Sequence, residues 1–73
     1  MQNKEKARNI AKQKRIENQI SVLEQEIEKL NNDLASEDVY SDYTKVLDLQ
    51  KQIQEKSEQV DILTAEWLEL EIK

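Results

Sequence analysis

Five residue types are missing from this 73-residue sequence: glycine, proline, cysteine, histidine and phenylalanine. Without glycine, the chain cannot form the loops that cradle phosphate in P-loop and Rossmann nucleotide sites. Without histidine and cysteine, it lacks the common zinc ligands, a cysteine nucleophile and any Ser-His-Asp triad. Its 16 acidic side chains are typical of a solvated helix surface. We therefore expect no enzyme activity and no metal or cofactor site in this chain.

Other absences restrict the compartment and the fold. A chain without cysteine forms no disulfide, which fits a reducing compartment. There is no run of 18 apolar residues, and the basic N-terminal stretch is not followed by an apolar block, so we expect neither a membrane span nor a secretory signal. Because tight turns need glycine and proline, a chain rich in Glu, Lys, Gln, Leu and Ile is expected to form long helices with few turns.

Two stripes of residues follow heptad spacing, with alternating steps of three and four. The first stripe is Ile16, Ile20, Leu23, Ile27, Leu30 and Leu34. The second stripe is Val46, Leu49, Ile53, Lys56, Val60, Leu63, Trp67 and Leu70. Such spacing is typical of helices that pack along one seam. Only Lys56 interrupts the apolar pattern, and its ammonium is expected to reach out of the seam to Glu24 or Glu26.

The segment between the stripes, residues 35–43, is rich in Ser and Asp, which compete with helix formation. We predict a first helix to about residue 35, a tip at 36–41 with Ser36 capping a short turn, and a second helix over about 42–72 with Ser41 as its N-cap. Because the break is short, the helices must be antiparallel neighbours. The predicted fold is all-α: a monomeric two-helix antiparallel coiled-coil hairpin over residues 16–73, preceded by a basic linker or helix extension over residues 1–15.

Two registers of this hairpin place one seam on the other. In the preferred register, the numbers of facing residues sum to 83, which pairs Leu30 with Ile53 and buries Trp67 against Ile16. In the alternative they sum to 76, which leaves more apolar side chains facing polar ones. The preferred register also lets Val39, Tyr40 and Tyr43 fold over Val46 and Leu47 as an apolar plug at the tip.

Charge is divided along the chain. Residues 1–15 carry a net charge of +5 and residues 16–73 a net charge of −10. The basic side chains of the first segment are Lys4, Lys6, Arg8, Lys12, Lys14 and Arg15. Lys4, Arg8, Lys12 and Arg15 would form one ridge on a helix. This segment is either an arm that contacts nucleic-acid phosphates or a solvated linker, and with no aromatic residue in it, any binding is expected to be electrostatic and weakly selective.

Some apolar residues leave two interpretations open. Tyr40 and Tyr43 form either a contact patch at the tip or a staple across the turn. The apolar residues off the seams are either scattered over the surface or part of a docking face. These residues are Leu47, Ile62, Leu68 and Ile72.

The segment from Ile16 to Leu70 resembles the C-terminal domain of the ABC-F ATPases, soluble ABC proteins with two ATPase cassettes and no membrane domain. The similarity lies in the run 24–30, the tip 34–43 with its sequence Val39-Tyr40-Ser41-Asp42, and the ending 66–71 with Trp67. The tip is the most specific part, because the heptads alone match many unrelated chains. Many relatives have proline in the tip turn, where this chain has Glu37.

The resemblance implies an antiparallel coiled-coil hairpin at the C-terminal end of a cytoplasmic ATPase. ATP and Mg²⁺ would then belong to the cassettes of the parent protein, and residues 1–15 would be the linker from the second cassette. The implied role is contact with DNA, ribosomal RNA or the ribosome, in translation regulation or antibiotic resistance. The alternatives are a structural hairpin that docks on the ATPase cassettes and positions them, and a tRNA-binding arm like that of some synthetases.

Overall fold

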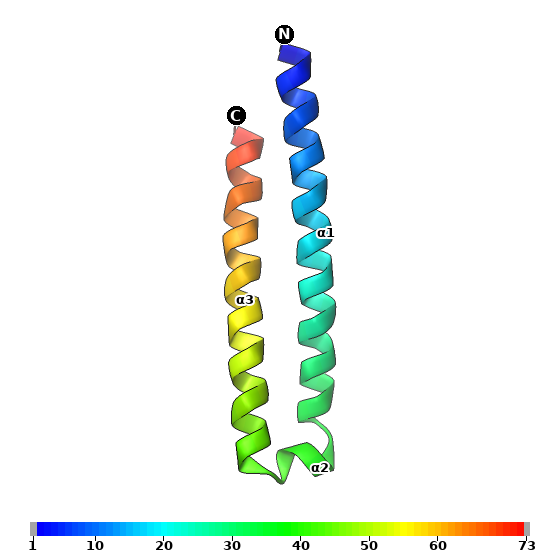
Figure 1. Ribbon diagram of the computed structural model, residues 1–73, viewed down its shortest axis with the longest axis vertical. Coiled ribbons are helices and arrows are strands. Elements are labelled where there is room, and N and C mark those ends of the chain that lie inside the picture. Colours follow the sequence, from blue (N-terminus) through cyan, green and yellow to red (C-terminus); the bar gives the residue numbers. More distant parts are fainter. Residues whose placement is uncertain (1, 73) are drawn as a thin grey trace.

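The computed structural model describes residues 2–72, with side chains from residue 6 onward. Two long helices, α1 (Gln2–Leu34) and α3 (Tyr43–Ile72), are joined by the four-residue helix α2 (Glu37–Tyr40). Figure 1 shows α1 and α3 side by side and antiparallel, with α2 crossing between them at one end. The molecule is a rod of 59 × 14 × 11 Å. Because the described residues form helices and no strand, and the long helices pack together, the structure agrees with the predicted all-α hairpin.

α1 runs through residues 15 and 16 without interruption, so the change of charge there does not coincide with a break in the backbone. Over residues 2–72, no helix is both long enough and apolar enough to span a bilayer.

The core is a single strip of side chains between α1 and α3. Among the described residues, Ile16 is the one buried hydrophobic side chain, at 8% exposure. The other seam residues, such as Leu23, Ile53 and Leu63, are half-buried. Two helices alone cannot surround a side chain on every side, so the seam excludes water only partially. Folding is therefore stabilised by many partial burials, each contributing less than the roughly 1.5–3 kcal/mol of a fully buried side chain.

Polar contacts between the helices identify the register. Lys56 Nζ lies 2.5 Å from Glu26 Oε2, in the one ion pair formed among the described residues. Trp67 Nε1 donates to Glu17 Oε1 at 3.1 Å, and Gln13 Nε2 donates to Glu71 Oε2 at 2.8 Å. The numbers of these pairs sum to 82, 84 and 84, which agrees with the preferred register of 83 and not with 76. The contact of Lys56 with Glu26 was one of the two predicted.

At the tip, the N-cap of α3 is one residue later than predicted. Asp42 Oδ1 accepts hydrogen bonds from the backbone N–H groups of Thr44 at 3.1 Å and Lys45 at 3.3 Å, which satisfies donors that have no partner within the helix. The Ser41 hydroxyl instead donates to the carbonyl of Glu37 at 2.7 Å, closing the end of α2. Ser36 is the N-cap of α2, as predicted, but its side chain makes no capping hydrogen bond.

The predicted apolar plug at the tip is wrong for the tyrosines. Val39 and Val46 are half-buried. In contrast, Tyr40 is 58% exposed, Tyr43 is 76% exposed, and Leu47 is also exposed. Val39 of α2 is thus partly covered, whereas Tyr40 at the end of α2 and Tyr43 at the start of α3 are mainly in solvent. The tyrosines therefore form an exposed pair at the tip and do not staple the turn.

Candidate nucleic-acid interface

The basic segment forms the N-terminal turns of α1. The side chains of Lys6, Arg8, Lys12, Lys14 and Arg15 are exposed, whereas that of Lys4 lies outside the described side chains. Figure 1 shows that the N-terminal turns of α1 extend beyond the end of α3. Lys6 and Arg8 therefore lie on turns with no described helix opposite them, because Ile72 faces the level of about residue 11 in the observed register.

The predicted basic ridge is divided by its surroundings. Lys12 and Arg15 line a hollow between the helices, together with Glu66 and Glu69 of α3. The acidic side chains across the hollow offset the positive potential of Lys12 and Arg15. The positive potential is therefore expected to be strongest at the projecting turns that carry Lys6 and Arg8.

A hydrogen bond between Gln13 of α1 and Trp67 of α3 connects the two helices on the tip side of the turns that carry Lys6 and Arg8. Gln13 Nε2 lies 3.4 Å from the carbonyl oxygen of Trp67, besides its bond to Glu71. Gln13 was not among the predicted seam or contact residues, although it lies seven residues before Ile20 and so continues the first stripe. Trp67 was expected to be largely buried; it is only half-buried, because its indole N–H reaches Glu17 at the surface.

The other candidate contact residues, Tyr40 and Tyr43, lie at the opposite end of the rod. The two sets are separated by most of the 59 Å length of the molecule. Aromatic stacking and phosphate contact are therefore not combined in one site. A nucleic acid on the basic turns would be held by charge alone, whereas the tip offers two aromatic rings on an acidic body.

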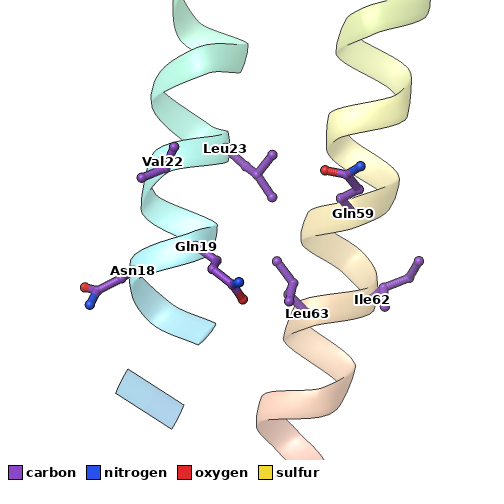
Figure 2. A pocket seen from close by; sticks show the side chains of 7 residues that line it. All are labelled: Asn18, Gln19, Val22, Leu23, Gln59, Ile62 and Leu63. Atoms are coloured by element: carbon purple, nitrogen blue, oxygen red, sulfur yellow. The ribbon is translucent and has the colours of Figure 1, made fainter. Parts of the chain in front are cut away.

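A second hollow lies between α1 and α3, nearer to the tip than the hollow lined by Lys12 and Arg15. It is lined by Asn18, Gln19, Val22, Leu23, Gln59, Ile62 and Leu63. In Figure 2, Leu23 and Leu63 point into the space between the helices, while Val22 and Ile62 lie on the outer sides of α1 and α3. This hollow has no charged lining residue, so it is suited to apolar contact.

A scan against protein-family models matches residues 3–71 to the ABC transporter C-terminal domain. The match covers nearly the whole chain. This chain belongs to the ABC transporter C-terminal domain family. The predicted resemblance to a C-terminal domain of ABC proteins is thereby confirmed. Searches of curated proteins and of solved structures found no match.

Membership of the ABC transporter C-terminal domain family assigns the chain to an accessory domain and not to the ATPase cassette. The residues present do not fit the ATP and Mg²⁺ that ABC proteins use. The chain has no glycine for a phosphate loop, and within the described part no three His, Cys, Asp or Glu side chains are grouped to hold a metal.

Proposed function

We propose that this chain is the non-catalytic accessory domain of a cytoplasmic ABC-F ATPase, and that it contacts nucleic acid, either DNA or ribosomal RNA on the ribosome. Family membership supports the accessory role. The tip sequence Val39-Tyr40-Ser41-Asp42 and Trp67 near the end support the ABC-F type. Through its parent protein, the domain would act in translation regulation or antibiotic resistance. Two ATPase cassettes encoded directly upstream in the reading frame would establish the parent; any other upstream sequence would contradict it.

The observation that carries nucleic-acid contact is the exposed positive charge on the projecting turns of α1. A phosphate backbone can approach Lys6 and Arg8 from several sides, because no described helix lies opposite them. Contact with the rest of the hairpin is unfavourable, since residues 16–73 carry a net charge of −10. A nucleic acid would therefore contact the N-terminal turns of α1 rather than the body of the hairpin.

Salt-dependent binding tests this proposal. Each neutralised phosphate of duplex DNA releases counterions, so the logarithm of the affinity should fall with the logarithm of the salt concentration with a slope of about −0.9 per contact. We expect binding in the micromolar range or weaker at physiological salt, as for non-specific complexes. A fluorescence anisotropy titration with a short DNA duplex and an RNA hairpin at low salt measures this.

A matched pair of variants separates the basic turns from net charge. Lys6→Glu with Arg8→Glu should abolish binding without unfolding the hairpin, because both residues precede the first seam residue. Lys45→Glu with Lys51→Glu makes the same change in net charge on the exposed surface of α3 and should leave most of the binding. Equal loss in both variants, or no binding by the original chain, would contradict nucleic-acid contact through the basic turns.

The alternative proposal is a structural hairpin that docks on the ATPase cassettes of its parent and positions them. The observation that favours it is the exposure of Tyr40, Tyr43 and Leu47 at the tip. Exposed aromatic side chains are frequent anchors of protein interfaces. If the anisotropy titration shows no binding while Tyr40→Ala with Tyr43→Ala lowers the ATPase activity of the full parent protein, the structural role is supported. An unchanged ATPase activity would contradict it.

A further inference from the structure

One face of the hairpin carries apolar side chains that the seam does not use. Val22 of α1 is 54% exposed and Ile62 of α3 is 60% exposed. They flank the hollow whose floor is formed by Leu23 and Leu63, a groove of about 530 Å³ (Figure 2). We call this side of the molecule the groove face.

The charged hollow lies on the same groove face. Arg15 precedes Val22 by seven residues on α1, and Glu69 follows Ile62 by seven residues on α3. In a coiled-coil hairpin, residues seven apart lie on the same side of a helix, one above the other. The hollow lined by Lys12, Arg15, Glu66 and Glu69 therefore continues the groove toward the open end.

Steps of seven residues toward the tip lead from Val22 to Lys29 on α1 and from Ile62 to Glu55 on α3. One edge of the groove face carries Arg15, Val22 and Lys29, and the other carries Glu69, Ile62 and Glu55. All six side chains are exposed. Among the described residues, none of the four charged ones is part of an ion pair. Because α1 and α3 are antiparallel, each level across the groove has a basic residue opposite an acidic one, or an apolar residue opposite an apolar one.

We propose that the groove face binds a second copy of this chain, with a two-fold axis parallel to the helices. This rotation places α1 of one copy on α3 of the other without shifting it along the rod. Arg15 then meets Glu69 of the second copy, Lys29 meets its Glu55, and Val22 meets its Ile62. The two hairpins then form a four-helix bundle. Val22 and Ile62 of each copy are covered, and each of the four charged residues of one copy faces a residue of opposite charge on the other.

The charges also determine the relative direction of the two copies. A two-fold axis perpendicular to the helices, lying in the plane between the two groove faces at the level of Val22 and Ile62, reverses one hairpin end to end. That arrangement places Arg15 on Lys29 of the other copy and Glu69 on its Glu55. Like charges at all four positions disfavour it, so the two tips of the dimer lie at the same end.

The association is weak, because only Val22 and Ile62 add newly covered apolar side chains in each copy. The two seams pack on each other within one hairpin, so the sequence predicts a monomer. At low concentration the chain is expected to remain monomeric. Pairing becomes measurable where hairpins are concentrated or held close together. Sedimentation equilibrium on the full chain, at concentrations up to about 2 mM, should show the mass rising from 8.6 kDa toward twice that value.

Two substitutions on α3 test the face. Ile62→Glu should weaken dimerisation by about tenfold or more, because it places a charge against Val22 of the second copy. Leu68→Glu is the matched control, since Leu68 is similarly exposed, at 51%, but lies on the other side of α3. It should leave the association constant unchanged. A chain that stays monomeric at every concentration, or equal effects of the two substitutions, would overturn the proposal.

Charge exchange tests the direction. Arg15→Glu with Lys29→Glu should abolish self-association, and so should Glu55→Lys with Glu69→Lys, because each variant pairs like charges across the interface. Mixing the two variants should restore a heterodimer at about the original affinity, since every pair is then complementary. Circular dichroism of each variant confirms that the hairpin is still folded. Folded variants that fail to associate when mixed would overturn the proposal. In the reversed arrangement like charges already meet in the original chain, so each variant alone would keep its affinity and the mixture would bind more tightly than the original chain; either result would overturn the parallel arrangement.

Discussion

Asp42 is the residue that begins α3, and its side chain explains where the tip ends. Its carboxylate accepts from the N–H groups of Thr44 and Lys45 and lies at the positive end of the helix dipole. The neighbouring Ser41, an equally suitable N-cap by residue type, is engaged with the carbonyl of Glu37. Ser41 is thus used at the C-terminal end of α2, and the N-cap of α3 falls to the next residue, Asp42.

We expect Asp42→Ala to lower the free energy of unfolding by about 1 kcal/mol, the usual cost of losing an N-cap. Ser41→Ala should cost less than about half of that, because its one exposed hydrogen bond contributes little. Urea denaturation followed by circular dichroism measures both. The opposite order would mean that Ser41 caps α3 in solution.

Trp67 combines a half-buried ring with a hydrogen bond at the surface. Trp67→Ala should lower the free energy of unfolding by about 2 kcal/mol, below the roughly 3–5 kcal/mol of a fully buried tryptophan. Glu17→Gln keeps an acceptor for the indole N–H and should change stability by less than about 0.5 kcal/mol. Tryptophan fluorescence should show a partially shielded indole; an emission maximum equal to that of free tryptophan would contradict the observed packing.

At the scale of the elements, register is the property on which both hollows and the groove face depend. The seam of α1 meets that of α3 over their full common length, and the pair Lys56–Glu26 satisfies the one charged seam position. A paired charge in a seam restricts register, because shifting the helices would separate it from its partner. Glu26 is therefore expected to act as a register marker as well as a weak stabilising contact.

Disulfide trapping measures the register directly. A chain with Leu30→Cys and Ile53→Cys should oxidise rapidly to an intramolecular disulfide, because these positions face each other in the observed register. A chain with Leu30→Cys and Val46→Cys should oxidise slowly, since its cysteines would face each other only in the register of 76. Faster oxidation of the second chain would contradict the structure.

For the molecule as a whole, stability is limited by two features. The core has one buried side chain among the described residues, and residues 16–73 are strongly acidic. Because residues 16–73 carry a net charge of −10 and the described part of the chain forms one ion pair, repulsion between exposed carboxylates opposes folding. Raising NaCl from about 10 mM to about 500 mM screens this repulsion and should raise the melting temperature by a few degrees. A fall in the melting temperature would mean that attractive charge pairs dominate.

The positions of the seams, the antiparallel arrangement and the register could be predicted from the spacing of apolar residues along the chain. The stripes from Ile16 to Leu34 and from Val46 to Leu70 occur at half-buried or buried positions because heptad spacing fixes which side of a helix is apolar, whatever the partner. The short break at 35–43 required the helices to be antiparallel, and matching the seams selected the register. The sequence does not distinguish Glu26 from Glu24 as the partner of Lys56, since both lie within reach of its long side chain.

Other features of the molecule depend on residues that the fold brings together across the hairpin. Tyr40 and Tyr43 are exposed because neither long helix covers the tip where they lie, and the heptad pattern does not extend through this break. Lys12 and Arg15 belong to one basic ridge by sequence, yet α3 places Glu66 and Glu69 beside them and leaves Lys6 and Arg8 unopposed. Val22 and Ile62 lie off the two seams and far apart along the chain. Only the antiparallel register places them on either side of one groove, because side-chain proximity between two helices depends on how the helices are placed relative to each other and not on either sequence alone.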